Sequence, residues 1–102
     1  MLVQNKEHIF KQIINHRDEF DGLGVHRFGL FGSFVKSEQT SESDVDLLVE
    51  FKPGKKTFDN FMELSFLLEK ILGRKVDLLT LESLSPHIGP RILAEVEYGV
   101  ID

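Results

Sequence analysis

Apolar residues recur at three- and four-residue intervals in three stretches of the chain, the spacing that gathers side chains on one face of an α-helix. These stretches span residues 4–20, 57–72 and 87–97. The middle stretch carries the strongest pattern, and we interpret its broad apolar face as core. Thr57 is suited to cap the start of this helix, and Gly73 is suited to end it, because glycine tolerates the left-handed backbone found after a helix. The expected packing positions are Ile9, Phe10, Ile13, Ile14 and Phe20; Phe58, Phe61, Met62, Leu64, Phe66, Leu67, Leu68, Ile71 and Leu72; and Ile88, Ile92, Leu93 and Val96.

Short runs rich in β-branched, aromatic and other apolar residues lie between the helical stretches. They predict strands over residues 25–31, 44–51 and 75–80. Ser33 follows the first strand and is a natural cap for a short helix that we expect to end near Glu38. The order helix, strand, short helix, strand, helix, strand, helix predicts one mixed α/β domain over residues 1–102. We also expect a loop at 39–43, a turn at Pro53-Gly54, a turn or single helical turn at 81–85 and a short terminal strand at 98–102.

The composition is that of an ordinary globular protein, because 41% of the 102 residues are hydrophobic and 28% are charged. The net charge of −5 argues against a broad basic surface, so no direct nucleic-acid binding is expected. It leaves room for a nucleotide that arrives with a divalent cation. The absence of cysteine excludes disulfides and thiolate zinc sites. No secretory signal and no run of ~18 apolar residues is visible, so we expect a soluble cytoplasmic protein with no membrane partner.

Two aspartates stand two residues apart at the head of the second predicted strand. Side chains at i and i+2 of a strand point the same way, so Asp44 and Asp46 should project from one face while Val45 turns to the other. Two carboxylates this close repel each other unless a cation lies between them. Mg²⁺ suits such a site, because it takes hard oxygen ligands from a few carboxylates and from substrate phosphates. Asp77, inside the third predicted strand, would complete a three-carboxylate site if the two strands are neighbours in one sheet.

Each of these features also has an ordinary structural interpretation. An isolated Asp-x-Asp is commonly a solvated strand start, Gly32-Ser33 can be a simple helix cap, and Asp77 can be a surface residue of an edge strand. Their combination favours chemistry, because two metal ions about 3.5–4 Å apart, bridged by carboxylates, support in-line displacement at phosphorus. Such a reaction needs a turn that holds phosphate followed by a strand that holds metal ions. The packing of a hydrophobic core does not require this combination.

The order of these motifs resembles the nucleotidyltransferase superfamily related to DNA polymerase beta. The resemblance rests on Gly32-Ser33 and, eleven residues after Ser33, on Asp44-Val45-Asp46. Within the superfamily, the chain is similar along essentially its whole length to the minimal nucleotidyltransferases that act as antitoxins of HEPN-domain toxins. The resemblance implies a nucleotidyltransferase fold, with a small mixed sheet of about three to four strands flanked by helices.

The same resemblance implies the roles of individual residues. Gly32 and Ser33 would hold the triphosphate of ATP, whose charge suits backbone N–H donors at a helix start. Asp44, Asp46 and Asp77 would be the catalytic carboxylates and the ligands of two Mg²⁺ ions, and Asp77 would also help to deprotonate the acceptor hydroxyl.

The phosphate motif departs from the family at one charged position. The family commonly reads Gly-Ser-x-Ala-Arg-Gly, where this chain has the sequence GSFVKS over residues 32–37. Lys36 at the arginine position keeps the charge but not the two-pronged guanidinium. It is a candidate nucleotide-binding residue, and a solvated helix lysine is the equal alternative.

Three functions follow from the resemblance. The first is Mg²⁺-dependent transfer of AMP from ATP to a hydroxyl, a tyrosine of the partner HEPN ribonuclease toxin, which neutralises the toxin. The second is an antitoxin that blocks the toxin by binding alone, and the third is transfer to a small molecule or RNA. Retention of all three aspartates favours the first function over the second. Small-molecule transferases of the superfamily usually carry an additional helical domain, so we expect the acceptor surface to come from a partner protein.

Overall fold

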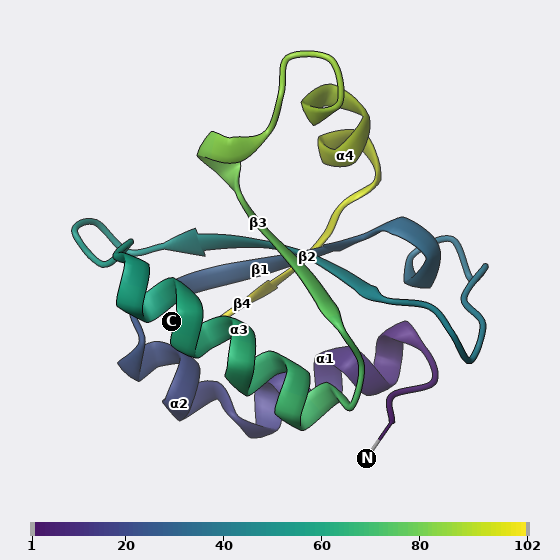
Figure 1. The fold of residues 1–102 in the computed structure, drawn as a ribbon, viewed down its shortest axis with the longest axis horizontal. Coiled ribbons are helices and arrows are strands. Elements are labelled where there is room, and N and C mark those ends of the chain that lie inside the picture. Colours follow the sequence, from purple (N-terminus) through teal and green to yellow (C-terminus); the bar gives the residue numbers. More distant parts are fainter. Residues whose placement is uncertain (1, 102) are drawn as a thin grey trace.

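The computed structural model describes residues 2–101 and shows a four-stranded mixed sheet flanked by helices (Figure 1). The strand order is β3-β2-β1-β4, in which β1 is antiparallel to β2 and β4, and β3 is parallel to β2. The expected α/β class and mixed sheet are therefore confirmed. Along the chain the elements are α1 (Lys6–Asn15), α2 (Arg17–Gly22), β1 (Val25–Phe31), the 3₁₀ helix η1 (Gly32–Phe34), β2 (Val45–Phe51), α3 (Phe58–Leu72), β3 (Val76–Thr80), the 3₁₀ helix η2 (Leu81–Ser83), α4 (Gly89–Glu95) and β4 (Glu97–Val100).

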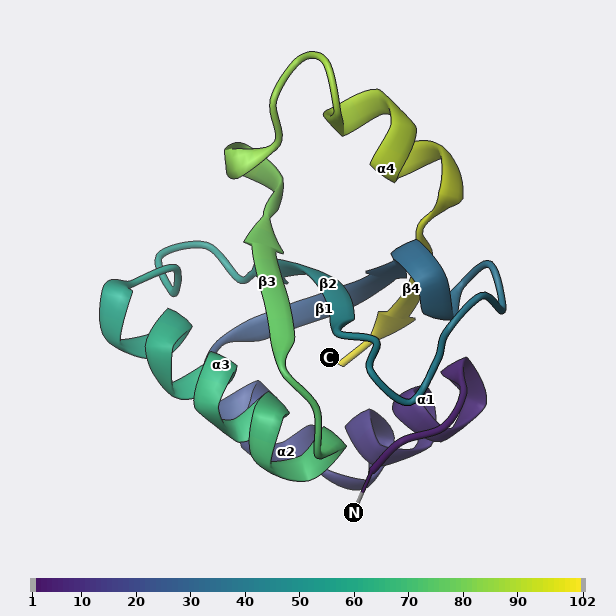
Figure 2. The same cartoon turned by 45° about the vertical axis from the view of Figure 1, so that its right-hand side comes forward.

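The two faces of the sheet are covered unequally. Successive side chains of a strand point to opposite faces. Accordingly, Leu47 of β2 belongs to the main core, whereas Leu48 joins a small cluster with Phe31 and Ile92. Figure 2 shows α1, α2 and α3 together on one side of the sheet, with α4 standing apart from them. Asp46 has the same parity as Leu48, so its side chain faces the side of the sheet on which α4 lies. Within residues 2–101, no helix has the length and apolar character needed to cross a membrane.

The residues predicted to cap α3 do so in the structure. The Thr57 hydroxyl accepts a hydrogen bond from the N–H of Asn60 at 3.1 Å, the contact expected of a helix cap. At the other end, Gly73 adopts the left-handed conformation with φ of 71°. Its N–H donates to the carbonyl of Glu69 at 3.0 Å, which satisfies a carbonyl of the last turn.

The interpretation of the whole apolar face of α3 as core was wrong for two residues. Phe58 is 78% exposed and Phe66 is 65% exposed. One side of a helix reaches the sheet, and nine apolar residues in fifteen positions cover more than one side. The residues of α3 that are buried against the sheet are Leu64, Leu68, Ile71 and Leu72.

The helix predicted over residues 4–20 is broken at His16. Its backbone (φ −108°, ψ 20°) is not helical and separates α1 from α2. Ile13 before the break and Phe20 after it are both buried, whereas Ile14 is 61% exposed, contrary to prediction. Neither proline nor glycine marks this bend in the sequence, and the buried residues Ile13 and Phe20 lie on either side of it.

The last predicted helix, residues 87–97, is shorter than expected. It begins at Gly89 and ends at Glu95, because Val96 is extended and β4 follows at once. Of the four expected packing positions, Ile92 is buried, but Ile88 is 58% exposed and Leu93 is 43% exposed. The expected terminal strand is confirmed as β4, which pairs with β1; Asp102 lies outside the described residues.

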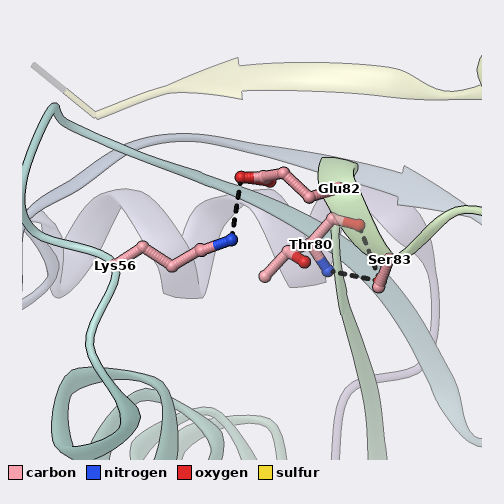
Figure 3. A network of polar contacts seen from close by, with 4 residues as sticks. All are labelled: Lys56, Thr80, Glu82 and Ser83. Atoms are coloured by element: carbon pink, nitrogen blue, oxygen red, sulfur yellow. Dashed lines mark hydrogen bonds and ion pairs between the residues drawn. The ribbon is translucent and has the colours of Figure 1, made fainter.

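The turn after β3 is held by its own side chains (Figure 3). Ser83 Oγ donates to the carbonyl of Thr80 at 2.8 Å and accepts from the N–H of the same residue at 3.2 Å. Beside it, Lys56 Nζ lies 3.1 Å from a carboxylate oxygen of Glu82. The backbone N–H of Glu82 and then Lys56 lower the pKa of this carboxyl group. Of the two alternatives predicted for residues 81–85, a turn or a single helical turn, the structure shows a short helical turn, η2.

Candidate nucleotide and metal site

The parallel pairing of β2 and β3 brings two of the predicted carboxylates side by side. In the register of these strands, Asp46 is directly opposite Asp77. Asp44 lies immediately before β2, so the strand that we predicted to begin at Asp44 begins one residue later, at Val45. The expectation that Asp77 belongs to the strand next to Asp46 is therefore confirmed, although β3 begins at Val76 and β2 at Val45.

The electrostatic effect of this grouping falls on Asp46. The pKa of Asp46 is raised from 3.8 to about 6, first by burial, then by the charge and hydrogen bond of Asp77, and then by the charges of Asp44 and Glu95. A carboxylate placed among carboxylates holds its proton more tightly, because the ionised form is repelled. Asp46 is therefore the centre of the acidic group.

The donors in this group suit a hard divalent cation. All are carboxylate oxygens, the ligands that Mg²⁺ prefers, and a cation would relieve the repulsion that, after burial, raises the pKa of Asp46. Among residues 2–101, no three His, Cys, Asp or Glu side chains meet in a geometry that could hold a metal ion. The structure thus brings Asp46 and Asp77 together, with Asp44 close enough to act on Asp46 through its charge.

Gly32 lies directly against the metal-binding candidates. It follows β1, whose last residue, Phe31, pairs with Asp46 across the sheet. Its φ of 78° is a conformation that side chains disfavour, and a Cβ at this position would overlap the Asp46 carboxylate. Only glycine therefore lets the turn pass so close to Asp46, and the phosphate and metal candidates form one continuous site.

The segment after Gly32 is a tight turn and not the capped helix that we predicted. Ser33 lies inside η1, the cap position is occupied by Phe31, and no side chain caps the segment. The N–H of Glu38 donates to the carbonyl of Ser33 at 2.9 Å, and Ser37 is left-handed with φ of 58°. Ser37 stands where the family motif has glycine, so the backbone explains why glycine is common there.

Arg74 holds the loop that leads into Asp44, a role that sequence patterns did not reveal. It is 7% exposed, and its Nη1 donates to the carbonyls of Thr40 and Ser43 at 3.0 and 2.8 Å. Its guanidinium also lies 5.0 Å from the centre of the Phe34 ring. Arg74 therefore ties the phosphate turn to the residue before Asp44.

Glu95, at the end of α4, is a second residue that sequence analysis missed. Its Oε1 accepts a hydrogen bond from the N–H of Gly32 at 3.1 Å, and its Oε2 lies 3.3 Å from Lys36 Nζ. A carboxylate three residues after Ile92, on the packing side of the helix, was the available signal. Lys36 therefore lies beside the other candidate residues, and its ammonium group is paired with Glu95.

A cavity of about 380 Å³ adjoins these residues. It is lined by Phe31, Gly32, Lys36, Asp46, Ile88, Arg91, Ile92 and Glu95.

The sequence of the chain matches a known family. The model of the nucleotidyltransferase domain matches residues 10–99. The chain belongs to the nucleotidyltransferase domain family. It is therefore an enzyme of the nucleotidyltransferase class, as the resemblance of its motifs implied.

Two relatives of the nucleotidyltransferase are similar over most of their length. A candidate protein adenylyltransferase of Methanocaldococcus jannaschii is 46% identical over 72 residues, which cover 71% of this chain and 76% of that protein. The protein adenylyltransferase MntA of Thermococcus cleftensis is 37% identical over 99 residues, which cover 96% of this chain and 99% of that protein.

Solved structures share the fold. A candidate minimal nucleotidyltransferase has a TM-score of 0.69 and 29% identity, covering 86% of this chain and 93% of that chain. A mutant form of the toxin–antitoxin complex of MntA has a TM-score of 0.65 and 25% identity, covering 95% of this chain and 72% of that chain. Both support the nucleotidyltransferase fold expected from the sequence.

Proposed function

We propose that this nucleotidyltransferase is the antitoxin of a HEPN ribonuclease toxin and neutralises it by Mg²⁺-dependent transfer of AMP from ATP to a tyrosine hydroxyl of the toxin. The observation that carries the proposal is the contact between the Gly32 turn and Asp46, opposite Asp77. This contact supports the proposal because a triphosphate held by the Gly32 turn would lie beside metal ions held by Asp46 and Asp77. The relative MntA is a protein adenylyltransferase, which favours AMP as the transferred group.

Each residue has a role that its position supports. The backbone of Gly32 and Ser33, with the ammonium group of Lys36, binds the triphosphate. Asp44, Asp46 and Asp77 would hold two Mg²⁺ ions, whose charge would neutralise the phosphates and the pyrophosphate leaving group. In the transfer, the bond from the acceptor oxygen to the α-phosphorus forms as the bond to pyrophosphate breaks. Asp77 accepts the proton of the hydroxyl.

An acceptor from another protein fits the placement of Asp77. Asp77 is exposed on β3, one of the two edge strands of the sheet, so a second molecule can approach it. Tyr98, the single tyrosine of the chain, lies on β4 at the opposite edge, with the Arg27 guanidinium 3.7 Å from its ring centre. The chain therefore does not bring its own tyrosine to the carboxylates.

The test is transfer of label from α-labelled ATP to the co-expressed toxin in Mg²⁺, comparing wild type with the Asp44→Ala/Asp46→Ala double variant. Glu63→Ala, an exposed acidic change on α3, is the matched control. We expect label on the toxin with wild type and control, no label with the double variant, and loss of label when the target tyrosine is replaced by phenylalanine. If the double variant protects cells as well as wild type does, blocking by binding alone replaces the catalytic account. Label on RNA or on a small molecule, with none on the toxin, would identify a different acceptor.

A further inference from the structure

Two groups that the proposed function assigns to the triphosphate are already engaged by Glu95. The Gly32 N–H and the Lys36 ammonium group contact the two oxygens of this one carboxylate, at 3.1 and 3.3 Å. The Glu95 side chain is 25% exposed, so the contact is partly sheltered from water. A carboxylate resembles a phosphate group in charge and in its hydrogen-bond acceptors. Glu95 thus occupies the place where an anionic phosphate oxygen would be expected.

Glu95 and a triphosphate cannot occupy this place together. The Gly32 N–H cannot donate a full hydrogen bond to both the Glu95 carboxylate and a phosphate oxygen, and two anions this close repel each other. The position of Glu95 allows its departure, because it is the last residue of α4 and the next residue, Val96, is extended. A change of side-chain rotamer is enough to free the turn.

Arg91 offers a positive charge to the same cavity. It lies one helical turn before Glu95 on α4, the spacing that puts two residues on one face. Arg91 lines the cavity with Gly32 and Lys36, and its guanidinium has no hydrogen bond or ion pair with any residue between 2 and 101. A guanidinium can donate two parallel hydrogen bonds to phosphate. Arg91 can therefore make the paired hydrogen bonds that the arginine of the family motif would make and that Lys36, in its position, cannot.

We propose that α4 is part of the nucleotide site: Arg91 binds the triphosphate, and Glu95 holds the phosphate turn in the nucleotide-free state until the triphosphate displaces it. The inference rests on the proposed function, because it takes ATP to be the ligand of the Gly32 turn. It adds two residues that the family motif does not contain.

The test is the dissociation constant of ATP, measured by calorimetry with Mg²⁺ for wild type, Glu95→Gln and Arg91→Gln. Glu97→Gln and Arg17→Gln are matched controls, because both positions lie outside the cavity. Glutamine can still accept from the Gly32 N–H, so Glu95→Gln removes the charge and keeps the fold; thermal unfolding verifies this. We expect ATP to bind ~10-fold tighter to Glu95→Gln and ~10-fold weaker to Arg91→Gln, with the controls within about twofold of wild type. Inorganic tripolyphosphate should compete with ATP, and more effectively in Glu95→Gln.

The opposite results would overturn the inference. Unchanged or weaker ATP binding by Glu95→Gln would make Glu95 a bystander or a support of the turn, and unchanged binding by Arg91→Gln would remove Arg91 from the site. If wild type labels the toxin while either of these results is found, the inference fails and the proposed function stands. If wild type binds no ATP, both fail.

Discussion

Replacing Asp46 with asparagine should stabilise the metal-free chain while it abolishes AMP transfer. The pKa of Asp46 is raised from 3.8 to about 6, chiefly by burial and by Asp77. A shift of about 2 pKa units corresponds to about 3 kcal/mol for a fully sheltered group. Asp46 is only half-buried, and solvent screening reduces this to about 1–2 kcal/mol. Asparagine has no charge to repel and can donate a hydrogen bond to Asp77, as the protonated aspartic acid does.

The gain should depend on pH in a defined direction. Because the pKa of Asp46 is higher in the folded state, the folded chain binds more protons than the unfolded chain between pH 3.8 and about 6. The charge of Asp46 therefore costs nothing below about pH 4, and its cost grows as the pH rises and is complete above about pH 6. The difference between Asp46→Asn and wild type should be largest at pH 8 and should vanish near pH 4.

Urea unfolding at pH 8 and pH 4.5, in EDTA, measures this difference. At pH 8 we expect Asp46→Asn to be more stable by about 1–2 kcal/mol, or about 5–10 °C in Tm for a domain of this size. Glu63→Gln, an exposed change of the same kind, should stay within about 0.5 kcal/mol of wild type. Mg²⁺ should stabilise wild type more than the variant. Equal stability at pH 8, or a difference that grows as the pH falls, would refute the argument that burial and the neighbouring carboxylates make the charge of Asp46 destabilising.

Three further substitutions test how the backbone shapes the site. Gly32→Ala should cost about 3 kcal/mol of stability in urea unfolding, because alanine at φ of 78° is strained and its Cβ overlaps Asp46. A loss below about 1 kcal/mol would contradict the close approach of the Gly32 backbone to Asp46. Ser37→Gly should raise stability by about 0.5–1 kcal/mol, since it relieves a left-handed serine at φ of 58°, whereas a loss would mean that this conformation carries no strain. Arg74→Lys should lower the free energy of unfolding by about 2 kcal/mol and slow AMP transfer, because lysine cannot bond both loop carbonyls and also lie against Phe34. Unchanged stability in thermal unfolding would show that Arg74 does not hold the loop.

Local chemistry by itself determined several elements of this protein. The caps of α3 at Thr57 and Gly73 act within a few residues of themselves, so the sequence alone predicted the bounds of that helix. The projection of Asp44 and Asp46 from one face also follows from strand geometry alone. The resemblance carried by these motifs predicted the nucleotidyltransferase family, and the match of the family model to residues 10–99 confirms it.

Other features depended on contacts between distant parts of the chain, which no local pattern contains. The register that sets Asp46 opposite Asp77 is chosen by the packing of β2 against β3, and the bend at His16 by the burial of Ile13 and Phe20. The exposure of Phe66 follows from the limited width of the sheet that α3 covers.

The clearest case is Glu95, which meets the Gly32 N–H across 63 residues of sequence. A hydrogen bond between such distant residues forms only when β4 pairs with β1 and brings the end of α4 to the turn. The sequence therefore determined which groups could bind a nucleotide and metal ions. The tertiary structure decided which of those groups meet, because charge and hydrogen bonding act over a few ångströms and only folding brings the partners that close.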